Sequence, residues 1–186
     1  AMNTHRNAFA GRNFEYYSED PILSGRIASE AVKGAAEHGV YAYIKHFALN
    51  DQETNRTYQL MTWADEQTVR EVYLRPFEIC VKEGNAKAVM AAFNHYGIIP
   101  AYASDNVLNK ILRDEWGFRG MVLIDYFGAG GYGYLDANRA TRNGTDFCLT
   151  AIDAGFNYVK DKSATATLAL RKASHNILYT TVNSSI

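Results

Sequence analysis

Four short runs, largely apolar except for the more polar last one, constrain the fold of this chain more than any other feature, and a stretch with helical periodicity separates each from the next. The runs are residues 40–46, 88–93, 121–124 and 145–150. Continuous apolar runs of this length are typical of strands that are buried on both faces. Strands that alternate with helices favour a parallel sheet built from right-handed βα units. We therefore predict an α/β fold.

Local signals mark where the helices begin and end. Asp20 is a suitable N-cap and Pro21 suits the first helical turn, while Thr62 with Asp65 resembles a capping box. Pro76 should kink the second helix, and Gly117 should stop the third. On the last helix we expect an inward face, which comprises Leu170, Ala173, Ile177 and Leu178. The predicted helices are 20–39, 62–84, 104–116, 135–142 and 163–182.

Four to five βα units correspond to about half of a (β/α)8 barrel, which needs eight strands to close and fill its interior. We therefore predict that residues 1–186 form a single partial barrel domain, with a leading loop at 1–20 and βα units over 21–182. Two sheet edges would remain unpaired, and self-association or another polypeptide would cover them. An open, doubly wound sheet is the alternative.

Composition excludes several classes of partner. The formal net charge is −1 and the basic residues are scattered, which gives no reason to expect nucleic acid or an anionic membrane surface. We find no apolar run long enough to span a membrane. Cys80 and Cys148 lie in apolar segments, which suits buried thiols better than a disulfide or a metal site. We expect a cytoplasmic, bacterial-type protein in a reducing compartment, with export left open.

Polar residues follow the predicted strands where parallel sheets carry their chemistry. Asp125 ends the run 121–124, so it is a candidate catalytic carboxylate, although an Asp there can also cap a loop. Lys45 and His46 end the first run and could donate to substrate hydroxyls. Arg12 could clasp vicinal hydroxyls or pair with Glu15.

Several motifs together closely resemble the family-3 glycoside hydrolases. They are GRNFEYYSEDP at 11–21, KHFALNDQE at 45–53 with Arg56 after it, REVYLRPFE at 70–78 and LRDEWGFRG at 112–120. The resemblance implies a (β/α)8 barrel that cleaves a β-glycoside with retention, with Asp125 as the nucleophile. It also implies that Arg12, Lys45 and His46 grip the sugar hydroxyls, that Met90 and Tyr126 line the pocket, and that no metal or cofactor is needed.

The chain departs from the family pattern at two motifs. Ile124-Asp125-Tyr126 stands where the family has Ser-Asp-Trp, and Phe93-Asn94 stands where it has Tyr-Asn. In the family, a neighbouring α/β domain supplies the acid/base Glu, and the matched motifs contain no counterpart. A retaining enzyme needs this second carboxyl group about 5 Å from the first. Loop residues that could replace it are Glu15, Asp51, Glu53 and His95, and the sequence does not choose among them.

Two other functions compete with a glycosidase. Gly128, Gly130 and Gly133 satisfy G-x-G-x-x-G after a strand, which would suggest a dinucleotide-binding oxidoreductase, but Asp146 begins the next strand instead of ending it. The chain could also be a vestigial barrel fragment that folds and self-associates without chemistry. A glycosidase assembled as a homodimer, or with a complementary barrel half, predicts turnover of a β-glycoside. Its stacking platforms could be Trp63, Tyr96 and Tyr126.

Overall fold

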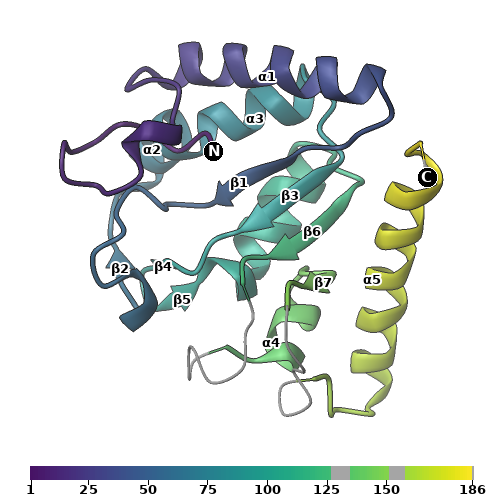
Figure 1. Ribbon diagram of the computed structural model, residues 1–186. Coiled ribbons are helices and arrows are strands. Elements are labelled where there is room, and N and C mark those ends of the chain that lie inside the picture. The colour runs from purple at the N-terminus through teal and green to yellow at the C-terminus, as the bar shows by residue number, and fades with distance from the viewer. Residues whose placement is uncertain (127–134, 151–157, 186) are drawn as a thin grey trace.

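The computed structural model describes residues 1–126, 135–150 and 158–185. Within these ranges, four strands form a parallel sheet in the order β1 (Tyr43–Phe47), β3 (Ala88–Ala91), β6 (Met121–Ile124) and β7 (Phe147–Cys148), as Figure 1 shows. Each strand pairs with the next one along the chain, so successive βα units lie side by side. The predicted parallel α/β architecture is confirmed.

The strand predictions differ in accuracy. β6 has the predicted bounds, whereas β1 begins three residues later than predicted and β7 keeps only two residues. The segment 94–101, predicted to be a loop, contains β4 (His95–Tyr96) and β5 (Ile99–Pro100), which pair antiparallel around Gly97. β2 (Met61–Thr62) pairs with β4 to complete a second, three-stranded sheet. Gly97 has a positive φ of 60°, which suits this tight turn.

The helices lie close to the predicted ranges. The long ones are α1 (Pro21–Glu37), the continuous run of α2 (Glu66–Thr68), η3 (Val69–Leu74) and α3 (Arg75–Lys82), then η5 (Asn106–Glu115) and α5 (Ala164–Val182). The short ones are η1 (Asn13–Glu15), η2 (Arg56–Tyr58), η4 (Ala101–Ala103) and α4 (Ala137–Arg142). The helix at 62–84 begins later than predicted, because Asp65 is its N-cap and Thr62 belongs to β2.

The turns before Pro76 adopt π geometry, in η3, where we predicted a kink. Proline has no amide hydrogen and its ring crowds the preceding turn, so the helix ladder must change there. Val69, Phe77 and Val81 of this continuous helix are buried, and Tyr73 is partly buried against the core.

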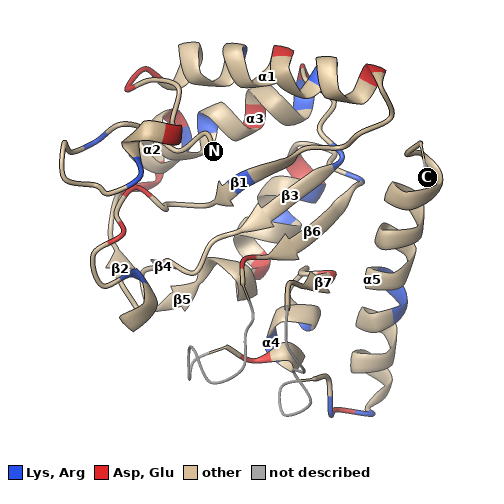
Figure 2. Ribbon diagram, in the orientation of Figure 1, with Lys and Arg blue, Asp and Glu red and all other residues tan. Residues whose placement is uncertain are grey.

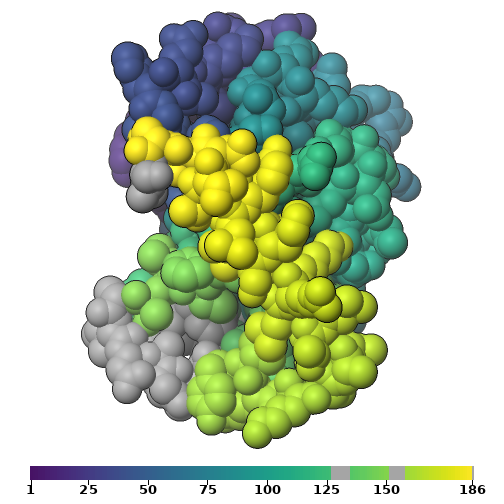
Figure 3. All heavy atoms as spheres, turned by 90° about the vertical axis from the view of Figure 1, so that its right-hand side faces the viewer, coloured from purple at the N-terminus to yellow at the C-terminus, as the bar shows by residue number. Residues whose placement is uncertain are grey.

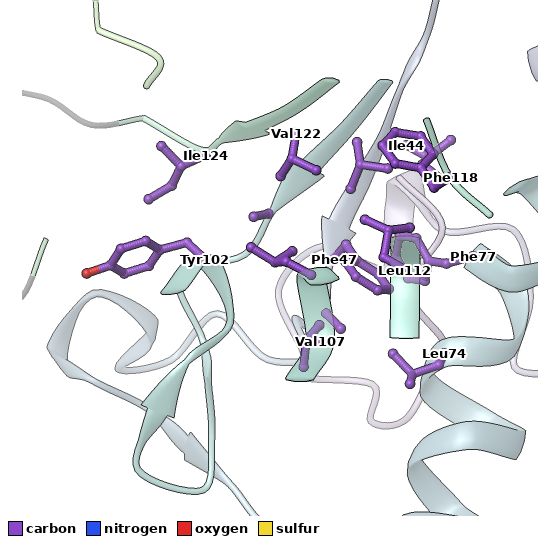
Figure 4. Packing of buried hydrophobic residues seen from close by; sticks show 14 of the residues in the cluster. Ile44, Phe47, Leu74, Phe77, Tyr102, Val107, Leu112, Phe118, Val122 and Ile124 are labelled. Atoms are coloured by element: carbon purple, nitrogen blue, oxygen red, sulfur yellow. The ribbon is translucent and has the colours of Figure 1, made fainter. Parts of the chain in front are cut away.

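The core lies between one face of the parallel sheet and the helices. Alternate strand residues point into it, including Ile44 and Phe47 of β1 and Ile124 of β6 (Figure 4). The Phe47 ring meets Phe77 of α3 edge-on, with centroids 5.1 Å apart, and Trp116 at 5.7 Å. This packing fixes β1 against α3 and η5, and it therefore fixes the strand ends that follow.

The two outermost long helices bury small and polar residues. On α1 the buried face comprises Ser24, Gly25, Ala28, Ser29 and Val32. Large apolar residues lie on the outside instead, since Leu23 is 50% exposed and Ile27 is 43% exposed. In α5, which crosses the face turned toward the viewer in Figure 3, Ala173, Asn176 and Thr180 are buried.

The predicted inward face of α5 is therefore wrong at two positions, because Leu178 is 62% exposed and Leu170 is exposed too. The helix is positioned by a polar contact that periodicity cannot reveal. Asn176 Nδ2 donates to Asp146 Oδ1 at 2.9 Å, and Asp146 Oδ2 accepts from Arg113 Nη2 at 2.7 Å and from the Val122 amide at 2.8 Å. Asn176 lies on the buried side of α5, and Leu170 and Leu178 lie on its outward side.

The opposite face of the parallel sheet carries half-buried residues, including Tyr43, Lys45, Met90 and Met121, which share the register of the pairing. Met2 and Asn3 cover part of the free edge of β1, where the Met2 amide donates to the Lys45 carbonyl at 2.9 Å.

Cys80 is buried and Cys148 partly so, and both are free thiols. Among the described residues, we find no helix long and apolar enough to cross a membrane.

Candidate active site

The candidate site lies at the C-terminal ends of β1, β3 and β6. Asp125 follows β6 directly, and its amide donates to the Ala91 carbonyl at 3.2 Å, which extends the β3–β6 ladder by one step. The N-terminal segment and the loop after β1 bring charged residues to the same place. Figure 2 shows acidic and basic positions interleaved along these two segments.

The Asp125 carboxylate is 15% exposed and has partners at both oxygens. Oδ1 accepts from the Tyr126 amide at 2.7 Å. Oδ2 lies 3.3 Å from Arg56 Nη1 and 3.3 Å from His46 Nε2. The carboxylate is therefore held in one orientation by a cation, an imidazole and a backbone amide.

A break in the β1–β3 pairing aims His46 at Asp125. Lys45 pairs with Met90 and Phe47 pairs with Ala91, so that His46 has no partner in the ladder. Irregular pairing of this kind commonly re-aims a side chain next to an active site. The Asn3 side chain holds the His46 backbone at both its amide and its carbonyl. The peptide bonds Lys45–His46 and Phe47–Ala48 are cis.

His46 acts as a neutral imidazole. Burial, followed by the nearby charges of Arg12, Arg56 and Lys45, lowers its pKa to about 2. Nε2 also contacts Arg12 Nη1 at 3.2 Å, where it must accept a hydrogen bond, whereas a hydrogen bond to Asp125 needs Nε2 to donate. A single tautomer serves only one of these contacts.

Cations and carboxylates alternate around the site. Glu15 pairs with Arg12 Nε and lies 3.7 Å from Lys45 Nζ. Glu53 pairs with Arg56 Nε at 3.1 Å and lies 3.7 Å from Arg12 Nη1. Each cation is therefore held by a carboxylate in a fixed position. The N–H groups of the cations that these pairs do not use can bind a ligand. The arrangement brings together Arg12, Glu15, Lys45, His46, Glu53, Arg56 and Asp125.

Arg56 is the main residue of the site that the sequence did not single out, although it ends one of the quoted motifs. Its Nη1 donates to Asn50 Oδ1 at 3.1 Å, and its guanidinium lies over the Phe93 ring, 5.1 Å from the centroid. The loop after β1 thus folds back so that Arg56 reaches β6. Only the order of the motif, with an Arg shortly after Lys45-His46, hinted at this placement.

The side chains of the other predicted site residues take no part in these contacts. Asp51 Oδ1 accepts from the Thr4 amide at 2.8 Å, on the N-terminal segment. His95 is buried in β4, and burial lowers its pKa. Met90 neighbours Lys45 in the β1–β3 pairing, while Tyr126 is 37% exposed beside Asp125.

Neither a metal nor a dinucleotide gains support from the described geometry. Among the described residues, no group of three His, Cys, Asp or Glu side chains could hold a metal ion. The glycines 128–133 lie outside the described residues. Asp146 precedes β7, as expected from the sequence. Its carboxylate oxygens accept hydrogen bonds from Arg113, Asn176 and the Val122 amide, so its role is structural.

Comparison with known proteins identifies the family of the chain. The family model described as the Glycosyl hydrolase family 3 N terminal domain matches residues 2–175. Beta-glucosidase B of Emericella nidulans is 45% identical over 124 residues, which are 67% of this chain and 15% of that protein. A beta-glucosidase of Rhizobium radiobacter is 45% identical over 130 residues, or 69% of this chain and 16% of that protein.

Solved structures show the same similarity in three dimensions. Beta-glucosidase 3B of Thermotoga neapolitana, solved in complex with alpha-D-glucose, matches with a TM-score of 0.84 and 38% identity, over 98% of this chain and 26% of that one. The beta-glucosidase of Kluyveromyces marxianus also gives 0.84, at 30% identity, over 98% of this chain and 23% of that one. This chain thus spans about a quarter or less of the proteins that it matches. From its motifs, its site and these matches, the chain belongs to glycosyl hydrolase family 3, within the TIM-barrel-like α/β domain that opens the family's proteins.

Proposed function

We propose that this chain carries the nucleophile side of a retaining β-glycosidase site, with Asp125 as the nucleophile. The single observation that carries the proposal is the fixed carboxylate of Asp125, which has Arg56 Nη1 and His46 Nε2 each 3.3 Å from Oδ2. A retaining mechanism needs an ionised carboxylate beneath the anomeric carbon. The Arg56 guanidinium can give this carboxylate a charge-assisted hydrogen bond.

The charges around Asp125 suit a neutral sugar. The cations Arg12, Lys45 and Arg56 are balanced by the carboxylates of Glu15, Glu53 and Asp125. These six groups carry no net charge together, and they offer both donors and acceptors to the hydroxyl groups of a neutral ligand. In this proposal Arg12, Lys45 and His46 bind the sugar hydroxyls, Met90 and Tyr126 line the pocket, and the substrate is a β-glucoside, as the names of the relatives suggest.

The chemistry would proceed in two displacements. The Asp125 carboxylate attacks the anomeric carbon while the glycosidic oxygen leaves with a proton from a general acid, and water later releases the sugar from Asp125. Glu15 and Glu53 are each tied to two cations, and Asp51 contacts the N-terminal segment instead. We therefore place the acid outside the described residues of this chain, where the remaining length of the relatives offers a source.

We also propose that the parallel sheet is part of a barrel that another polypeptide or a second copy completes. Four parallel strands in sequential order, with helices on one face, correspond to a partial (β/α)8 barrel over residues 1–186. Completion of the barrel by a second copy, or by a complementary half, would cover the half-buried sheet face. The rival hypothesis is that the chain is a non-catalytic fragment that only folds and associates. The following experiment distinguishes this hypothesis from a role of Asp125 as nucleophile.

A fluorinated glucoside with a dinitrophenyl leaving group tests the nucleophile directly. Dinitrophenolate departs without protonation, so the reaction does not need the missing acid, and the fluorine at C2 slows hydrolysis of the glycosyl-enzyme. We expect mass spectrometry to find the label on Asp125 and to find none in Asp125→Asn. Asp114→Asn, an exposed carboxylate on η5, should label as the wild type does. A folded protein that stays unlabelled, or is labelled at another residue, would support the non-catalytic alternative.

A further inference from the structure

A second cavity lies on the other side of the loop that follows β1. Its volume is about 310 Å³, which is at the lower end of the range for small-molecule sites. Its walls come from the N-terminal segment, the loop at 49–52, β2 and η3, at the left of Figure 1. Asp125, His46, Arg12 and Arg56 do not line it. The cavity is therefore separate from the candidate active site, although both use the same loop.

One wall offers an open aromatic surface. Trp63 follows β2 directly and is 72% exposed. It is backed by Gly97, where an added Cβ would lie 3.4 Å from the indole ring. The indole ring therefore lies within van der Waals range of the β4–β5 turn. The positive φ of Gly97 favours glycine at this turn. An exposed aromatic ring held in this way can stack on the C–H face of a ligand.

The opposite wall carries one acid and one base. Asp51 Oδ1 accepts from the Thr4 amide at 2.8 Å, and across the described residues Oδ2 has no hydrogen-bond partner. The Arg6 guanidinium lies over the Tyr73 ring, 5.5 Å from its centroid, and pairs with no carboxylate in the part of the chain that the structure describes. Both groups are therefore held in place while they retain hydrogen-bonding capacity.

The combination favours one class of ligand. Asp51 offers a carboxyl group and Arg6 offers N–H donors, so an uncharged molecule whose hydroxyl groups both donate and accept hydrogen bonds matches the pair. A pyranose ring has both hydroxyls and an apolar face for Trp63. We propose that this cavity binds a pyranose unit of a neutral carbohydrate, at a site distinct from Asp125. The proposal rests on the proposed function for its choice of ligand class, but its test needs no turnover.

Cellobiose titrations of the Asp125→Asn protein test the site, because this variant cannot hydrolyse the probe. The chain has two tryptophans, and Trp116 is buried, so the exposed Trp63 should dominate any change in fluorescence. We expect a saturable change with a Kd on the order of 1 mM. Asp51→Asn or Arg6→Ala, introduced into the same protein, should weaken binding at least about tenfold.

Calorimetry extends the test to Trp63→Ala, which removes the fluorophore and should also remove the binding heat of this site. Because Trp63 is exposed, this variant keeps the proposal testable even if Asp51→Asn fails to fold. Tyr58→Ala, which removes another exposed aromatic ring, should leave binding unchanged. The proposal is overturned if Trp63 shows no saturable response, or if His46→Ala abolishes it, because the latter result would assign the signal to the Asp125 site. Labelling of Asp125 by the fluorinated glucoside would be independent of either result.

Discussion

At the scale of single residues, Arg56 links the loop after β1 to the carboxylate that follows β6. It contacts Asp125, Glu53 and Asn50 through its guanidinium and covers the Phe93 ring. Its own side chain is only 12% exposed, so its contacts are made largely out of water, where charge pairs are stronger. Asp125 therefore depends on a residue that is far away in sequence and belongs to a loop.

Replacing Arg56 by alanine should slow the labelling of Asp125 by the fluorinated glucoside about 100- to 1,000-fold, because catalytic sites lose about this much when one preorganised donor is removed. The measurement is the rate at which the labelled protein accumulates. Arg26→Ala is a matched control, since Arg26 forms an exposed ion pair with Glu83 away from the site. Equal labelling rates in the two variants would show that Arg56 does not position the nucleophile.

Asp51 should make folding stability depend on pH. Burial raises its pKa to about 7, against the opposing effects of the Thr4 amide and the Arg6 charge, whereas its value in the unfolded chain is near 3.8. Between these values the folded chain holds a proton that the unfolded chain releases. The free energy of unfolding should therefore fall as the pH rises from about 4 to about 7.

Asp51→Asn should remove this dependence, because an amide cannot ionise but can still accept from the Thr4 amide. We expect the wild type to lose about 2–4 kcal/mol relative to the variant between pH 4 and pH 8, at about 1.4 kcal/mol for each pKa unit. Urea unfolding at several pH values measures the difference. Asp114→Asn, an exposed carboxylate, serves as the control, and parallel pH profiles for wild type and Asp51→Asn would contradict the prediction.

At the scale of elements, local signals predicted the structure well where the cause is local. Asp20 caps α1 by accepting from the Ile22 and Leu23 amides, and Ser163 caps α5, because a capping side chain acts within its own turn. The run at 121–124 is a strand as predicted, since its apolar residues are buried. The β4–β5 hairpin was missed because its two-residue strands are stabilised by pairing with β2 and with each other.

The residues of the candidate site also divide into those that local sequence could place and those that contacts between distant segments place. Asp125, Lys45 and His46 follow from the rule that parallel strands carry functional residues at their C-terminal ends. Arg56 could not be placed by this rule, because the path of its loop is set by contacts with Asn50 and Phe93. The position of Asp51 on the far side of the same loop depends on its bond to Thr4, which is 47 residues away.

Two glycines of α1 form a matched pair that tests its packing. Gly25 faces α3, and an added Cβ would lie 2.8 Å from Ile79 Cδ1 and 3.1 Å from the Pro76 backbone, whereas the same atom at Gly34 would meet nothing within 4 Å. Gly25→Ala should therefore lower the free energy of unfolding by about 1–3 kcal/mol through overpacking. Gly34→Ala should raise it by about 0.5–1 kcal/mol through helix propensity. Urea denaturation measures both, and equal effects would contradict the close approach of α1 to α3.

At the scale of the whole molecule, the sheet is covered unequally. Helices and a continuous core occupy one face, while Tyr43, Lys45, Met90 and Met121 remain half-buried on the other. The free edge of β1 is only partly covered by Met2 and Asn3, and β7 is the other edge of the sheet. A parallel sheet is normally covered on both faces, so this open face is where a further part of a barrel would fit.

If a second copy supplies that part, the isolated chain should be a dimer in solution. Light scattering coupled to size exclusion should then give twice the mass of one chain, because a stable interface of about 1,200 Å² or more could form over the open face. Met121→Lys places a charge on this face and should shift the protein to the monomer. Leu168→Lys, at an exposed position of α5, should leave the mass unchanged. A monomeric wild type would instead indicate that a different polypeptide completes the barrel, and a dimer that persists in Met121→Lys would place the interface on another surface.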